Sequence, residues 1–310
     1  MATDRTTIIR GPGSVTYGGQ TLFDANGINA SLDSSTGEIP SSVSGNIGTM
    51  KTDQTGKVTL TPCGQVSAAL VALLFPYGNP TIGSSACGST DRPLVVHSLA
   101  GTKVSFLNAV LSKMPEIYLS PVKTAFGSLE FSAALAKGKA PGDANSLYKV
   151  ETGTYGLGAP DPSGIVGVQY SAEFGDLTIA DTADGWTVTP EVTLQPVVVD
   201  SVGTIDWTIA DVACTAKCTP IGLTEAQILA ALPVAQARGS LVGGSDDLVI
   251  TGGTGGLTVT LKNASLVQGP LQWGNTALRV GEIGFTAHRS FSSGTPGPLF
   301  TVAYNAPTSD

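Results

Sequence analysis

Charged residues and histidines are scarce in this chain of 310 residues. Lys, Arg, Asp and Glu make up 13% of it, and there are two histidines, whereas an average protein is about a quarter charged. A Ser-His-Asp hydrolase needs a histidine base, but His97 lies in a strand pattern and His288 follows a strand-like Phe285-Thr-Ala. No serine has the flanking glycines of a nucleophile elbow. We therefore expect no catalytic residue and no enzyme activity.

Long apolar runs are also missing. The longest, Ala68 to Phe75, is far too short to cross a bilayer. The segment Met1 to Thr7 lacks the apolar region of a secretory signal. We expect a chain that is made and kept soluble in a cytoplasm and does not enter a membrane.

Cysteine and aromatic residues are few. The four cysteines do not have the spacing of a structural zinc site, and a disulfide is disfavoured in a reducing compartment. We predict small buried or half-buried thiols and leave their state open; they are Cys63, Cys87, Cys214 and Cys218. Aromatic residues make up 6%, which is low for a sugar-binding platform.

Two other patterns resemble ligand sites but favour turns. Gly252 to Gly256 has no following Lys-Ser/Thr and no helix, so a phosphate-binding loop is disfavoured and a hairpin turn is predicted. The pair Asp181 and Asp184 lacks the terminal Glu of a calcium loop, and Asp246-Asp247 precedes a strand. We expect no metal and no cofactor.

The chain is short of positive charge, and the deficit is uneven. The formal net charge is −8, which argues against binding to nucleic-acid phosphates. Residues 1–150 hold 11 basic and 9 acidic residues, a net of +2, whereas residues 151–310 hold 5 and 15, a net of −10. Two interpretations stay open. The asymmetry reflects chance and solubility, or the two halves face each other in an assembly.

What the chain does have is short alternating segments separated by Gly, Asn, Asp and Ser. Period-two alternation predicts half-buried strands, and many short strands predict an antiparallel sandwich or barrel. The clearest segments are 57–61, 94–97, 103–107, 129–132, 166–170 and 257–261. Two segments instead predict short helices, 65–74 and 223–232. In the second, Thr224 and Gln227 have capping-box spacing, and an apolar stripe is expected to dock on a sheet; it consists of Ile228, Leu229 and Leu232.

The two helices belong to an internal repeat. Thr61-Pro62 matches Thr219-Pro220 at an offset of 158, and Leu94-Val-Val matches Leu248-Val-Ile at 154. Further matches keep the same order: Gly48-Thr49 with Gly203-Thr204, Asn108-Ala109 with Asn263-Ala264, Pro115 with Pro270, Tyr118 with Trp273, Phe131 with Phe285, and Val15/Tyr17 with Val168/Tyr170. A shared order with slowly drifting offsets indicates a duplication.

The repeat sets the predicted domain boundaries. We expect an N-terminal arm over 1–11, a first domain over 12–150, a Gly/Pro-rich linker over 151–164, a second domain over 165–305 and a C-terminal tail over 306–310. Linkers of this composition are typical of domain boundaries. The fold class predicted is all-β, with one short helix in each repeat.

Four features resemble the major tail tube proteins of long-tailed bacteriophages, in a form with two domains per chain. The start Gly11-Pro-Gly-Ser-Val-Thr-Tyr-Gly-Gly, followed by Leu22-Phe-Asp, is similar to an arm that enters a first strand. The strand Val58 to Pro62 leads into a helix, and paired strands follow around 104–107 and 129–131. The segment Asp33 to Gly45 is interpreted as a long polar loop between two early strands.

The resemblance implies a β-sandwich with a flanking helix, whose strands join an inner β-barrel when subunits form a ring. Rings of the family usually hold six domains, so three chains with two domains each would make one ring. The chain would then be a structural protein of the virion tail, assembled in the host cytoplasm, and DNA would pass through the lumen without specific binding. Its partners would be other copies of itself and the tail terminator, tape measure and distal tail proteins.

The resemblance also suggests which residues meet a neighbour. The predicted loop 33–45 and its counterpart near 191–201 would reach an adjacent subunit or ring. The interaction residues expected there are Asp33, Glu38, Ile39, Val43, Glu191, Val192, Val198 and Asp200.

Alternative functions stay open. A tandem β-sandwich binding module, such as a decoration, adhesin or receptor-binding protein, would place aromatic side chains at exposed loop tips. Trp186, Trp207 and Trp273 fall instead in strand patterns, which favours core or sheet positions. A tail terminator or distal tail protein is a further alternative.

Overall fold

The fold is taken from a computed structural model. It describes residues 13–64, 66–98, 101–122, 124–140, 143, 146–153, 158, 167–199, 203–232, 237–238, 246–268, 271–273, 278–292 and 295–306. The predicted N-terminal arm, most of the predicted linker and Asp200 lie outside the described residues.

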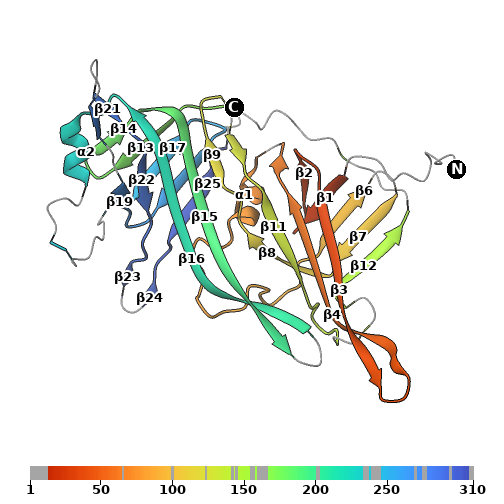
Figure 1. The fold of residues 1–310 in the computed structure, drawn as a ribbon. Coiled ribbons are helices and arrows are strands. Elements are labelled where there is room, and N and C mark those ends of the chain that lie inside the picture. The colour runs from red at the N-terminus through yellow and green to blue at the C-terminus, as the bar shows by residue number, and fades with distance from the viewer. Residues whose placement is uncertain are drawn as a thin grey trace.

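The described chain is mostly β-strand, with two short helices (Figure 1). Every strand pair is antiparallel, as predicted, and the strands form four larger sheets, here called A to D. Sheets A and B belong to the first half of the chain and sheet D to the second. Sheet C contains strands of both halves.

The strand orders of the sheets are as follows. Sheet A runs β12 (Tyr148–Thr152), β7 (Thr102–Phe106), β6 (Leu94–Ser98), β1 (Gly13–Tyr17), β2 (Gln20–Asp24), β5 (Pro62–Cys63). Sheet B runs β3 (Asn29–Ser41), β4 (Gly45–Leu60), β11 (Leu129–Ala134), β8 (Asn108–Lys113). Sheet C runs β10 (Thr124–Phe126), β9 (Ile117–Leu119), β15 (Asp181–Val199), β16 (Gly203–Ile221), β22 (Ile283–Thr286), β19 (Ser265–Gln268). Sheet D runs β14 (Leu177–Ile179), β13 (Tyr170–Phe174), β17 (Leu248–Gly252), β18 (Leu257–Leu261), β25 (Phe300–Tyr304).

Two small hairpins complete the described strands. One consists of β20 (Leu271–Trp273) and β21 (Leu278–Val280), and the other of β23 (Phe291–Ser292) and β24 (Thr295–Pro296).

The two halves have the same strand order. Sheet A without β5 has the strand order β12-β7-β6-β1-β2, and sheet D, read from its other edge, has the order β25-β18-β17-β13-β14. When the strands of each half are numbered along the chain, the two orders are the same. Sheet B reads β3-β4-β11-β8, and the second-half part of sheet C reads β15-β16-β22-β19. The hairpins β9–β10 and β20–β21 likewise follow β8 and β19 in the chain.

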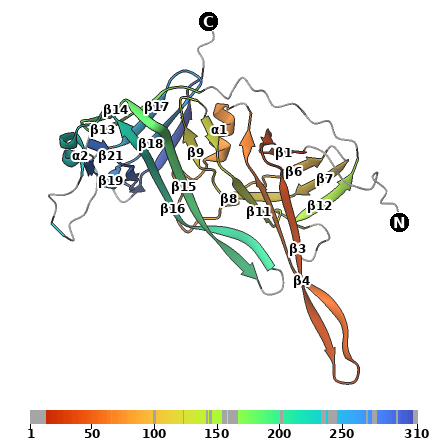
Figure 2. The same ribbon diagram turned by 45° about the horizontal axis from the view of Figure 1, so that its top comes forward.

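Two long hairpins are the most conspicuous feature of the fold. The first arm consists of β3 and β4 and the second arm of β15 and β16, and both project from the same side of the molecule (Figures 1 and 2). The arms have one register: Ser41 pairs with Gly45 at one tip and Val199 with Gly203 at the other, 158 positions later.

The irregularities of the two arms also coincide. The first arm shifts register after Ser35 and after Ile39, and the second arm shifts after Thr193 and after Val197, which lie 158 positions later. The second arm has one further shift near its base, between Thr182 and Trp186. We call residues of the two halves equivalent when they occupy the same place in these pairings.

The pairings give other counterparts for three of the predicted matches, those of Gly203, Tyr17 and Tyr118. Gly203 is equivalent to Gly45, not to Gly48. In the first strands, Tyr17 pairs with Leu94 and Phe174 with Leu248, so Tyr17 is equivalent to Phe174 and not to Tyr170. The first error arose because Gly-Thr dipeptides are common in a Gly-rich chain, and the second because the β13 strand lies four residues later than the pattern 166–170 predicted. Tyr118 is equivalent to Gln272 and not to Trp273, because each is the middle residue of its three-residue strand.

The core is one apolar cluster that continues through both halves. Within each half the sheets pack face to face, and equivalent rings meet across them. Tyr17 of sheet A lies 4.5 Å from Phe131 of sheet B, and Phe174 of sheet D lies 5.2 Å from Phe285 of sheet C, between ring centroids. Aromatic contacts at these separations add to the stability from burial.

Both predicted helices are present, although each is shorter than predicted. Helix α1 spans Ala68–Leu74 with Ser67 as N-cap, and α2 spans Glu225–Ala231 with Thr224 as N-cap. The capping box of Thr224 and Gln227 is confirmed. Of the predicted apolar stripe on α2, Ile228 is buried, but Leu229 is exposed.

Candidate assembly surfaces

The predicted interaction residues lie on the two arms, although not in loops. The prediction of a polar loop over 33–45 is wrong, because this segment is the distal half of β3 and the tip of the first arm. The counterpart over 191–199 is the distal half of β15. Both faces of a free arm meet solvent, so the sequence needs no apolar alternation there, and the strand signal is lost.

The structure places the individual residues as follows. Asp33, Glu38 and Ile39 lie on β3, and Val43 is at the tip, 92% exposed. Glu191, Val192 and Val198 lie on β15. The seven of these residues that the structure describes therefore form two groups, one on each arm, and the described pairings do not bring the groups together.

The arms expose further apolar side chains that the sequence analysis did not predict. Ile47 and Met50 of the first arm are exposed, as are Val197 and Val199 of the second, on either side of the predicted Val198. Apolar residues in a polar, Ser/Thr-rich run were the available signal. Large exposed apolar patches are typical of interaction surfaces, which makes the arm tips candidate contact sites.

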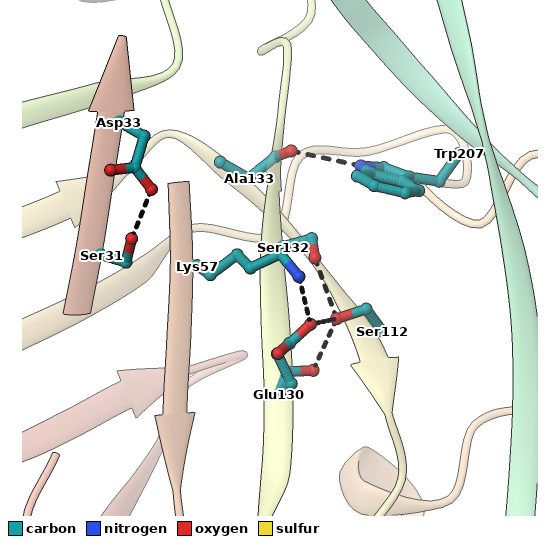
Figure 3. A network of polar contacts seen from close by, with 8 residues as sticks. All are labelled: Ser31, Asp33, Lys57, Ser112, Glu130, Ser132, Ala133 and Trp207. Carbon is teal, nitrogen blue, oxygen red and sulfur yellow. Dashed lines mark hydrogen bonds and ion pairs between the residues drawn. The ribbon is translucent and has the colours of Figure 1, made fainter. Parts of the chain in front are cut away.

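The second arm is held against the first half of the chain. The Trp207 indole nitrogen of β16 donates a hydrogen bond of 3.2 Å to the Ala133 carbonyl of β11 (Figure 3). The segment after α1 continues this contact, since the Ala86 amide donates to the Trp207 carbonyl at 2.7 Å and the Ile209 amide donates to the Ser84 carbonyl at 3.0 Å. The Ser85 hydroxyl also donates to Asp206 at 2.9 Å.

The base of the first arm is braced by polar contacts across sheet B (Figure 3). Lys57 of β4 lies 3.1 Å from Glu130 of β11, and the Ser112 hydroxyl of β8 donates to the same carboxylate at 3.1 Å. The Ser132 hydroxyl donates to Ser112 at 2.9 Å. The network ties β4, β11 and β8 together near the base of the first arm.

A strand pairing joins the two halves. Strand β9 of the first half pairs with the edge of β15 of the second, with Ile117 opposite Val188 and Leu119 opposite Trp186. Sheet C is continuous because of this pair. The sequence does not predict this joint, because pairing between distant edges leaves no local pattern.

A glycine marks the end of this joint. Gly185 has a φ of 85°, and a Cβ atom on it would overlap the Leu119 carbonyl oxygen. Only glycine combines a left-handed conformation with such a close backbone approach. The β9 strand can therefore lie against β15 because Gly185 has no side chain.

Helix α1 makes the second part of the joint. It packs on β25 of the second half (Figure 1). Next to it the Leu299 amide donates to the Gly78 carbonyl at 2.8 Å, and Arg289 donates to the Pro80 carbonyl at 2.9 Å. The halves thus share a sheet, a helix contact and the arm contact.

The thiols and histidines take structural positions. Cys214 and Cys218 are buried, and Cys63 and Cys87 are half-buried, as predicted. Burial raises the pKa of Cys87 to about 12, and the nearby Asp206 adds to the shift. Burial also raises the pKa of Cys63, so these thiols stay protonated near neutral pH. His288 contacts the Ser265 hydroxyl at 2.8 Å.

Within the described part of the chain, no group of three or more His, Cys, Asp or Glu side chains is arranged to hold a metal ion. Of the predicted turn carboxylates, Asp247 pairs with Lys262 at 2.6 Å and accepts the Asn263 amide at 3.0 Å. Gly252 to Gly256 connects β17 to β18, as predicted.

No protein-family model matches the chain, and no curated protein is significantly similar to it. None of the helices in the described residues has the length and apolar character needed to span a membrane.

Proposed function

We propose that the chain is a structural subunit of a bacteriophage tail tube and contains two copies of one assembly domain. The observation that carries the proposal is the shared strand order of the two halves, together with arms that have one register and the same irregularities. Two unrelated sandwiches would have no reason to share both. A duplicated domain that already pairs with its own duplicate through an edge strand is a unit suited to repeated assembly.

The duplication sets the expected stoichiometry. If each half takes one of six equivalent places, three chains close a ring with pseudo-sixfold symmetry. A closed ring pairs the edge strands of sheets, which otherwise promote aggregation. The four-stranded parts of sheets B and C, from which both arms project, would form the wall around the lumen.

The arms would make contacts beyond the subunit. Both project from one side of the molecule (Figures 1 and 2), and both expose apolar residues near their tips. Stacked rings provide cover for such residues. Rings with a net charge of −8 per chain would also let DNA pass without adhesion, because like charges repel.

The remaining roles follow from the tube. The protein would reside in the virion tail after assembly in the host cytoplasm, and it would contact the tail terminator, tape measure and distal tail proteins. It would act without a cofactor and without catalysis.

Electron microscopy of the purified chain, concentrated and incubated, tests the proposal. We expect hollow tubes of uniform diameter with a regular axial repeat. A variant with the charged tip substitutions Val43→Asp and Val198→Asp is the matched control, because both side chains are exposed and the fold should be unchanged. We expect it to form fewer and shorter tubes. Persistent monomers in the unmodified protein, together with binding to a glycan or receptor array, would favour the tandem binding module instead.

A further inference from the structure

The joint between the two halves consists of β9 on β15 and α1 on β25, and the equivalent elements at the two ends of the molecule have no such contact in the described residues. We propose that a second copy of this chain completes the equivalent joint, with β20 of one copy pairing along β3 of the next and α2 packing on β12. This inference deepens the proposed function, on which it rests for the presence of repeated copies. Its residues follow from the equivalences of the two halves.

The first observation is a pair of edges. In the chain, β9 covers the edge of β15 at Trp186 to Val188. The equivalent positions of the first arm are Ile28 to Ala30, and β3 is the last strand of sheet B in the described residues. Val188 is buried, whereas the equivalent Ala30 is exposed.

A hairpin suited to that edge is present at the other end of the molecule. Strands β20 and β21 follow β19 as β9 and β10 follow β8, and the two hairpins have the same length and pairing. In the described residues β20–β21 pairs with no other strand. Strand addition to an open edge is a common recognition mode, in which main-chain hydrogen bonds provide the affinity.

The second observation is a pair of glycines. Gly27 is equivalent to Gly185, and both have positive φ, 107° and 85°. A Cβ atom on Gly185 would overlap the backbone of β9, whereas one on Gly27 would meet nothing within 4 Å. The first half thus has the glycine that the joint needs, with the space beside it still open.

The third observation concerns the helices. α1 packs on β25, where Val302 is partly buried against the core. The strand equivalent to β25 is β12, and its Val150, equivalent to Val302, is 54% exposed. Helix α2, equivalent to α1, exposes 44% of Leu229. Each has an apolar residue without cover, and they lie at opposite ends of the molecule (Figures 1 and 2).

Charge is consistent with the same contact. The acidic half of one copy, net −10, would meet the near-neutral half of the next, net +2, as the halves already do within the chain. The contact is head to tail, so it repeats in one direction and produces a ring or a filament rather than a two-fold dimer.

The equivalences fix a register. Tyr118 pairs with Thr187 in the chain, so Gln272 of one copy should pair with Asn29 of the next. We would introduce Asn29→Cys and Gln272→Cys together in a chain that carries Cys63→Ser and Cys87→Ser. Mild oxidation should give covalent dimers and trimers that reducing agent returns to monomers.

Three matched controls define the geometry. Tyr118→Cys with Thr187→Cys should close a link within one chain, which changes gel mobility without a higher mass. Asp33→Cys with Gln272→Cys lies four residues out of register and should give at least tenfold less product. The single variants Asn29→Cys and Gln272→Cys should form dimers only when mixed, whereas dimers of either alone would indicate a two-fold contact and overturn the proposal.

A substitution on the helix side gives a second readout. Val150→Asp should abolish assembly and leave the thermal unfolding of the monomer unchanged, because the side chain is exposed. Val122→Asp, exposed outside the proposed contact, should assemble normally. Equal assembly of the two variants would contradict the role of β12.

The outcomes separate this inference from the proposed function. Tubes that form without the link between positions 29 and 272 would refute the inference and leave the tube function standing. The link with closed rings but no tubes would support the inference and contradict the tube function. Neither link nor tubes in the folded protein would refute both.

Discussion

The two arms have the same register, yet their surroundings differ. Ile209 of the second arm is buried, whereas Lys51 at the equivalent place of the first arm is exposed. The second arm meets the segment after α1 and the backbone of β11. In the described structure the first arm has no such cover. Because the strand pairing is equal, this difference shows which surfaces the second copy in our proposal would have to cover.

The same contrast separates the two edge glycines, and it leads to the prediction with the largest effect. Gly185→Ala should reduce the free energy of unfolding by about 2–5 kcal/mol, because strain from positive φ adds to overlap with β9. Gly27→Ala should cost only about 1–2 kcal/mol of strain in the monomer, since its surroundings are open. Urea unfolding of both variants measures the difference.

Assembly should respond to the Gly27→Ala substitution more strongly than the stability of the monomer does. A folded Gly27→Ala chain should fail to form tubes, because the added methyl group blocks the next copy. Equal costs for the two glycine variants in the monomer would break the proposed difference between a filled and an open edge.

The cores of the two halves differ at one pair of packed residues, where a larger side chain at one position accompanies a smaller one at the other. Gly56 and Phe106 of the first half are equivalent to Cys214 and Leu261 of the second. A Cβ atom on Gly56 would overlap the Phe106 ring. Gly56→Cys should therefore destabilise by about 1–3 kcal/mol, the usual cost of overpacking.

The double variant Gly56→Cys/Phe106→Leu copies the second half and should recover part of that loss. A double-mutant cycle from urea unfolding measures the coupling. Additive costs would mean that the two positions do not compensate each other.

The anchor of the second arm gives a smaller effect. Trp207→Phe removes the hydrogen bond to the Ala133 carbonyl and should cost about 1 kcal/mol. The hydrogen-exchange rate of the β16 amides between Trp207 and the tip of the second arm should increase. Thr49→Phe at the equivalent place in the first arm is the matched control, and we expect no loss of stability because Thr49 is exposed.

The smallest effect concerns pH. Burial, with the nearby Lys103, lowers the pKa of His97 below its usual value. The folded state therefore binds fewer protons than the unfolded state, so stability should decline as the pH falls below about 6.5, the unperturbed pKa. Urea unfolding at pH 5 and 7.5 measures the decline, and His97→Gln should reduce it. If the His97→Gln variant loses as much stability between pH 7.5 and pH 5 as the unmodified protein, other titrating groups cause the loss.

Local signals were enough to predict the strand character and the two helices. Alternation located β6 and β18, and capping residues located α2, because these elements are half-buried and their sequence records which side faces the core. The distal parts of the arms were not predicted as strands. Segment 33–41 has Ser, Thr and Gly on both faces, and its main-chain pairing is independent of such a pattern.

The joint between the halves could not be predicted from local pattern at all. Ile117 and Val188 are 71 positions apart, and their pairing depends on where two sheets present their edges. The repeated Pro-centred segments near 115 and 270 were the only trace of it in the sequence. What these segments do depends on the pairing of β9 with β15 and on the position of β20 at the other end of the molecule (Figure 1).

The number of chains in one ring tests the central claim most directly. Mass per unit length of purified tubes, multiplied by the axial repeat and divided by the chain mass of 31.4 kDa, gives that number. The account predicts three chains per ring, because each chain supplies two equivalent domains. Six chains per ring would contradict it, since the two halves would then have different places in the tube.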